Sequence, residues 1–140
     1  MAIDFLERID AIEECYEFLL GYAAQGLPSD QGSPAGREVR THLEQARDAL
    51  IGLPESCRQA IVDHQLEPTE KYDAFCSMLE RDVRDSLVAI EMVLAQPAIS
   101  SQLIDNLNAS SHVRTLLTDL FLFGEILRTR IKATVSVEGQ

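Results

Sequence analysis

The sequence predicts an all-α fold, a four-helix up-down-up-down bundle with a kinked or broken second and fourth helix. Apolar residues recur at spacings of three and four through nearly all of the 140 residues, while prolines and glycines divide the chain into four long segments. Strand-like alternation does not persist. Amphipathic segments joined by short connections most simply form such a bundle. The domain should cover residues 1–134, with residues 135–140 as a frayed tail.

The first helix should span residues 4–25, because Asp4 is a residue type that caps helix starts and Gly26 is one that ends helices. Its apolar residues fall within an arc of about 80°; they are Phe5, Ile9, Ile12, Tyr16, Leu19 and Ala23. A separate acidic flank carries Glu7, Asp10, Glu14 and Glu17. One side of this helix should therefore pack against other helices, while another side presents carboxylates.

A long loop should separate the first and second helices, since residues 26–36 contain three glycines and two prolines. Ser33 and Pro34 then fit the cap and the first position of the second helix. Its apolar spacing continues to Leu53, where Pro54 should break or kink the helix before a further short one.

The third and fourth segments differ in how clearly their ends are marked. Thr69 is suited to cap the third helix, which should end before Pro97. The fourth segment, residues 98–133, contains no proline, but polar residues within 106–112 interrupt its apolar track. We expect a break or kink there, with a serine capping a new helix. The alternative is a continuous helix with a polar layer in its packed face.

The charge balance argues against several classes of partner. With 23 acidic and 12 basic residues the net charge is −11, and no basic face suited to phosphates is visible. Nucleic acid and membrane surfaces are therefore not expected as partners. Residues 1–30 hold seven carboxylates and only one basic residue, Arg8. A basic partner is compatible with this asymmetry, and so is solubility alone.

The cysteines and the N-terminus indicate a cytoplasmic protein. Cys15, Cys57 and Cys76 are odd in number, far apart and without a C-x-x-C pair. This is typical of reduced thiols in or near a core rather than of a disulfide framework or metal site. The N-terminal residues lack the features of a secretory signal, and the most apolar window, residues 116–127, is too short to span a membrane.

That apolar window is the candidate interaction site, because eight of its twelve residues are apolar and they cover more than one helix face. A central core helix is one explanation. We favour a second interface, either a homodimer seam or a groove for a partner helix. Phe121 and Phe123 point about 200° apart and should not both serve one core. The predicted partner-binding residues are Leu116, Leu120, Phe121, Phe123 and Leu127.

A second hypothesis is a ligand or metal site in the polar region 105–119. Asp105, His112 and Asp119 are spaced by seven and would share one face of an unbroken helix, and His42 could join them from a facing helix. Consecutive members would lie about 10 Å apart along the axis, too far to hold one ion alone. A solvated polar stripe is the competing explanation, and no cofactor is expected.

No phosphate-binding loop, nucleophile elbow or Ser-His-Asp order occurs in the sequence. We therefore expect a non-catalytic protein–protein interaction module of adaptor, chaperone or regulatory type that forms a homodimer through its last helix. Another protein with a basic or apolar helix-binding surface is a further possible partner. The alternative function is a small-molecule- or metal-binding bundle that uses residues 105–119.

Overall fold

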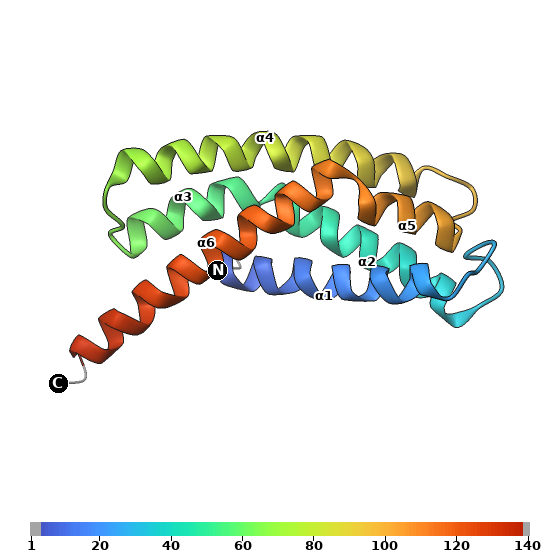
Figure 1. Cartoon of the computed structure of the whole chain (residues 1–140), viewed down its shortest axis with the longest axis horizontal. Coiled ribbons are helices and arrows are strands. Elements are labelled where there is room, and N and C mark those ends of the chain that lie inside the picture. Colours follow the sequence, from blue (N-terminus) through green and yellow to red (C-terminus); the bar gives the residue numbers. More distant parts are fainter. Residues whose placement is uncertain (1–3, 139–140) are drawn as a thin grey trace.

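Six α-helices make up the computed structural model, which describes residues 4–138 (Figure 1). They are α1 (Phe5–Ala24), α2 (Pro34–Ile51), α3 (Leu53–Asp63), α4 (Thr69–Leu94), α5 (Ser101–Ala109) and α6 (Ser111–Glu138). No strand occurs between residues 4 and 138, so the predicted all-helical class is confirmed. Within the same range, no helix combines the length and the apolarity that crossing a membrane requires.

The helices pack around one core. α1 and α4 run along the long axis of the molecule, and the consecutive pairs α2–α3 and α5–α6 pack on them (Figure 1). α1 contacts α2 and α5 most extensively, whereas α4 contacts α3, α6 and α2. Buried apolar side chains come from all six helices. The last part of α6 extends beyond the other helices (Figure 1).

The second predicted segment is divided at Gly52, which lies between α2 and α3. Pro54 occupies the first turn of α3, where the missing N–H of proline needs no partner. The guanidinium of Arg8 lies 2.5 Å from the position of a Cβ at residue 52 and donates to the carbonyl of Ala49 at 3.1 Å. The break was predicted at Pro54, but α2 already ends at Ile51. It ends there because Arg8 of α1 donates a hydrogen bond to a carbonyl at the end of α2.

The fourth predicted segment is divided within its polar block, as expected. Ser110 separates α5 from α6 with φ −57° and ψ 131°. Asn108, just before the break, is buried and donates its amide to the carbonyl of Leu19 on α1 at 3.2 Å. At the other end of α5, the side chain of Ser100 accepts from the Leu103 N–H at 3.0 Å, so this helix begins later than residue 98.

Two further helix ends differ from the sequence-based expectations. Pro68, not Thr69, is the cap of α4, and the Thr69 hydroxyl instead donates to the Glu67 carboxylate at 3.3 Å. α6 stays helical through residues 135–138, where a frayed tail was predicted, because adding a turn to an existing helix needs no new nucleus. Residues 139–140 lie outside the described part, and the single domain over 1–134 stays a prediction.

Asp30 holds one end of the molecule together. It is 8% exposed, and its carboxylate accepts from the Ile99 N–H and from Arg40 Nε, both at 2.7 Å. Burial alone would raise the pKa of Asp30, but the bonds from Arg40 and Ile99 outweigh it and hold the pKa below the ordinary value. The loop after α1 is thereby joined to the connection between α4 and α5.

Tyr22 and Ser101 strengthen the same joint. The Tyr22 hydroxyl donates to the Ile99 carbonyl at 2.7 Å, and the Ser101 hydroxyl donates to the Tyr22 carbonyl at 2.6 Å. The Ser101 N–H also donates to the Leu27 carbonyl at 2.8 Å. Gly36 packs directly on the backbone of the loop, where a Cβ would overlap the carbonyl of Asp30. The long loop is therefore held in place by hydrogen bonds and packing contacts with the rest of the fold.

Candidate functional site

The predicted partner-binding residues of α6 divide into two groups. Leu116, Leu120, Phe123 and Leu127 are at most 2% exposed and belong to the core. They do not form an exposed surface, because α6 packs against α4, α5 and α1 within the chain. Phe121 is 48% exposed and its neighbour Leu122 is 60% exposed. The interface prediction therefore depends on Phe121, with Leu122 added by the structure.

Phe123 has a core role that the sequence did not assign to it. Its ring centroid lies 5.2 Å from that of Phe5, 5.7 Å from that of Tyr72 and 4.9 Å from that of Phe75. The contact with Phe75 is edge-to-face, a favourable arrangement for aromatic rings. Phe123 thus joins α1, α4 and α6.

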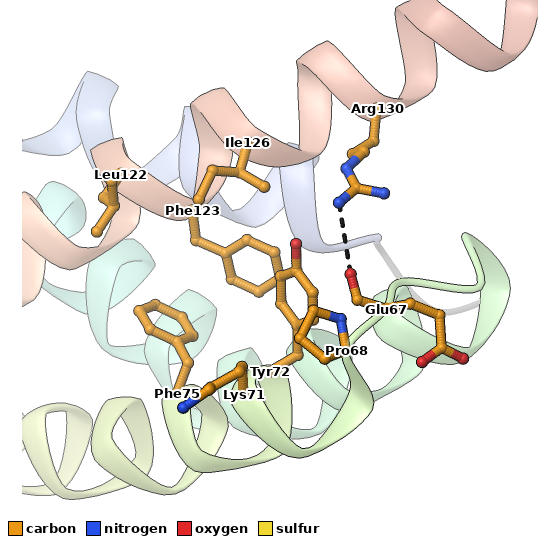
Figure 2. Close-up of a pocket in the computed structure, with 9 residues that line it drawn as sticks. All are labelled: Glu67, Pro68, Lys71, Tyr72, Phe75, Leu122, Phe123, Ile126 and Arg130. Atoms are coloured by element: carbon orange, nitrogen blue, oxygen red, sulfur yellow. Dashed lines mark hydrogen bonds between the residues drawn. The ribbon is translucent and has the colours of Figure 1, made fainter.

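A cavity of about 290 Å³ opens between α4 and α6 beside this aromatic cluster (Figure 2). Its apolar walls are Tyr72, Phe75, Leu122, Phe123 and Ile126. Tyr72 and Phe75 are half-buried, so their rings are accessible from the cavity. Leu122 forms one wall and is itself exposed, so the cavity is continuous with the exposed surface at this residue. We call Phe121, Leu122 and this cavity the α6 face.

Two basic residues lie at the mouth of the cavity. Lys71 comes from α4 and Arg130 from α6, and Arg130 Nη2 donates to the backbone carbonyl of Glu67 at 3.4 Å (Figure 2). The Glu67 carboxylate is turned away from the rings in that view and bonds Thr69. The mouth is therefore polar and positively charged, whereas the interior is apolar.

The predicted acidic face of α1 is exposed in the structure. Glu7, Asp10, Glu14 and Glu17 all lie at the surface. Asp10 accepts from Arg128 Nη2 of α6 at 3.1 Å, so the face is partly neutralised within the chain. Whether a partner binds there stays a prediction.

The predicted ligand or metal residues are not brought together. The break at Ser110 places Asp105 on α5 and His112 on α6, so they do not share one continuous helix face. His112 is exposed, with Nδ1 3.9 Å from the Asp85 carboxylate. Among the described residues, no group of three or more His, Cys, Asp or Glu side chains is arranged to hold a metal ion. A shallow depression of about 380 Å³ does lie in this region, between Ser111, Thr118 and their neighbours.

His42 has a structural partner. Its ring stacks in parallel on Phe18 with a centroid distance of 4.0 Å, and Nδ1 lies 2.9 Å from the Glu38 carbonyl. The contact with Glu38, one turn earlier on α2, involves the backbone carbonyl of that residue. His42 packs between α1 and α2 and away from the polar region of α5 and α6.

Asp119 is the one member of the predicted set with an unusual environment. Burial, followed by the hydrogen bond and the negative charge of Asp82, raises its pKa to about 7. Both side chains have a buried Oδ2 atom that receives no N–H donor. This α4–α6 carboxyl pair was missed, because Asp82 and Asp119 lie far apart in the sequence.

A wider groove of about 550 Å³ lies between the start of α1, α3 and α6. More than half of the residues around it are polar or charged, among them Asp4, Arg8, Asp63 and His64. The cavity of the α6 face is more apolar and more aromatic, and it is the better candidate site. Comparison with protein-family models, with curated proteins and with solved structures finds no significant match, so only the geometry of the chain itself bears on its function.

Proposed function

We propose that the protein is a non-catalytic, cytoplasmic interaction module, a four-segment up-down-up-down bundle that self-associates through the α6 face. The strongest support is the position of Phe121 and Leu122. Leu122 is exposed and lines an apolar, aromatic cavity, and Phe121, the residue before it, is exposed as well. An exposed apolar patch beside a concave site with a charged rim is typical of protein–protein interfaces.

A second copy of the chain is the partner that fits this surface best. A two-fold interface uses the same patch on both copies, so each patch must offer both a projecting and a receiving part. Leu122 and Phe121 are both exposed, and the cavity beside Leu122 can receive an apolar side chain. Its volume of about 290 Å³ is close to the lower limit of small-molecule sites, about 300 Å³, so a side chain has room to enter.

The charge distribution makes this proposal testable by salt. Two copies with a net charge of −11 repel each other at long range, while Lys71 and Arg130 reduce the negative charge near the contact. Raising the ionic strength from 0.01 M to 0.15 M shortens the Debye length from about 30 Å to about 8 Å. Self-association should therefore strengthen with salt, whereas binding of a basic partner to the acidic face of α1 should weaken.

The test is the mass of the protein measured by analytical ultracentrifugation over a range of concentrations. Phe121→Asp and Leu122→Asp should each weaken the dimer about 30-fold, the loss expected of a central interface residue. Val88→Asp is the matched control, because Val88 is 63% exposed on α4 and the substitution changes the charge equally. Circular dichroism should give the same helix content for all three variants.

Two results would contradict the proposal. If the wild-type protein is a monomer at every concentration and salt level, self-association is wrong. If the wild type is a dimer and both α6 variants keep its mass and affinity, the interface lies elsewhere. A dimer that only Val88→Asp disrupts would move the contact to the outer face of α4.

A further inference from the structure

Two cysteines lie against each other in the core, one from α3 and one from α4. The Sγ atoms of Cys57 and Cys76 are 2.8 Å apart, and neither residue is exposed to solvent. Both are free thiols. Their spacing in the sequence, with 18 residues between them, predicted separate core thiols. Packing of α3 on α4 brings them together.

The geometry favours a covalent bond between them. A disulfide has an S–S distance of about 2.05 Å, so the two sulfur atoms need to approach by only about 0.8 Å. We propose that Cys57 and Cys76 are a site of covalent modification, an intramolecular disulfide that links α3 to α4 on reaction with hydrogen peroxide. The proposal is independent of the α6 face and of self-association.

The surroundings give the two thiols different roles. The two sulfur atoms share a hydrogen bond in which either can be the donor, and this bond, together with the nearby Arg58 guanidinium, lowers the pKa of Cys76 despite its burial. The same bond raises the pKa of Cys57, and burial adds to the effect. Cys76 is therefore the sulfur that attacks the oxidant, because the thiolate is the nucleophilic form of cysteine.

The reaction balances in two steps. The Cys76 thiol attacks one peroxide oxygen, the O–O bond breaks, and the products are a Cys76 sulfenic acid and one water. The Cys57 sulfur then attacks the Cys76 sulfur, an S–S bond forms, and the sulfenic oxygen leaves with the thiol proton as a second water. Hydrogen peroxide is reduced to two waters, and the protein loses two hydrogen atoms.

Cys15 provides an internal control. It is buried on α1, and burial followed by the charge of Glu14 raises its pKa to about 11. It forms no hydrogen bond with another cysteine in the described part of the chain. Cys15 should therefore remain a thiol under conditions that oxidise the pair.

Access to the buried sulfur atoms requires α3 to open. This helix has 11 residues and no side-chain hydrogen bond at its N-cap, so its first turn lacks one common source of stability. Once formed, the disulfide removes conformational freedom from the unfolded chain. The disulfide would close a loop with 18 residues between the two cysteines, and for a loop of this length the melting temperature should rise by about 5–10 °C.

The experiment is peroxide treatment of the whole protein, followed by alkylation in denaturant and peptide mass spectrometry without reduction. Trypsin should give one linked species made of residues 48–58 and 72–81, two hydrogen atoms lighter than the two separate peptides. Cys15 should be fully alkylated. Cys15→Ala should give the same product, and Cys57→Ala should abolish it and the rise in melting temperature.

The peroxide treatment is repeated at a urea concentration just below the unfolding transition. At that concentration α3 opens more often, so peroxide can reach the buried sulfur atoms. If Cys57 and Cys76 are still fully alkylated there, the proposal is wrong. It is also wrong if Cys15 takes part in the bond, or if Cys57→Ala keeps the rise in melting temperature.

Discussion

Asp119 should make the stability of the protein depend on pH near neutrality. It lies on α6 opposite Asp82 of α4, and the buried Oδ2 atom of each receives no N–H donor. Burial, followed by the hydrogen bond and charge of Asp82, raises the pKa of Asp119 to about 7 from its ordinary 3.8. Two carboxyl groups in such a position share one proton in preference to ionising together.

The sign and size of the effect follow from these two pKa values. Between about pH 4 and pH 7 the folded protein holds a proton on Asp119 that the unfolded chain releases, so the free energy of unfolding falls as the pH rises. A difference between 3.8 and about 7 is equivalent to about 4 kcal/mol. Asp119 is only partly buried, and solvent screening reduces the expected loss to about 1–2 kcal/mol.

Urea unfolding at pH 5 and pH 8 measures this loss, with Asp119→Asn as the perturbation. The asparagine has the shape of the protonated acid and does not titrate, so the variant should be about 1–2 kcal/mol more stable than wild type at pH 8, and close to it at pH 5. Asp105→Asn, at an exposed position on α5, removes the same charge and should keep the wild-type pH dependence. An equal difference between wild type and Asp119→Asn at both pH values would refute the reasoning.

Three other substitutions test the hydrogen-bonded end of the molecule. Gly36→Ala should cost more than about 2 kcal/mol, because its Cβ would overlap the Asp30 backbone, whereas Gly21→Ala, in open space on α1, should stabilise the protein by about 0.5–1 kcal/mol; urea denaturation measures both. Tyr22→Phe should cost about 1–2 kcal/mol in the same assay, since it leaves the buried Ile99 carbonyl without its 2.7 Å donor. Equal stability of Gly36→Ala and Gly21→Ala, or an unchanged Tyr22→Phe, would contradict the described packing.

The all-helical fold class and several helix ends could be predicted from the sequence, because they depend on local chemistry. Asp4 and Ser33 cap α1 and α2 through side-chain bonds, as their positions in the sequence suggested. The break near Ser110 was also predictable, since a cluster of short polar side chains favours helix ends. The break at Gly52 could not be predicted, because the side chain that binds the end of α2, Arg8, comes from another helix.

Which side of a helix is buried was predicted only approximately. Cys15 and Tyr22 are buried in α1, whereas Tyr16 and Ala23, which the spacing assigned to the apolar arc, are only partly buried. α1 packs most extensively against two helices, α2 and α5, and together they cover a wider arc than one apolar stripe. The spacing of apolar residues predicts which side of a helix is buried, but it does not predict how wide an arc the neighbouring helices cover.

The candidate site shows the same limit. An excess of apolar residues in 116–127 was visible in the sequence, and it indicated contacts on more than one side of the helix. The pattern could not separate Phe123, which meets three other rings, from Phe121, which meets solvent. That distinction depends on where α1 and α4 lie.

The bonds around Asp30 bear on how the protein can be labelled or extended. A loop with several glycines and prolines is ordinarily the first choice for inserting a tag, because such loops tolerate added residues. Here an insertion between Leu27 and Asp30 would move apart two groups that hold Ser101 and Ile99. Gly32 is the better insertion point, since it is exposed and nothing lies within 4 Å of a Cβ placed there.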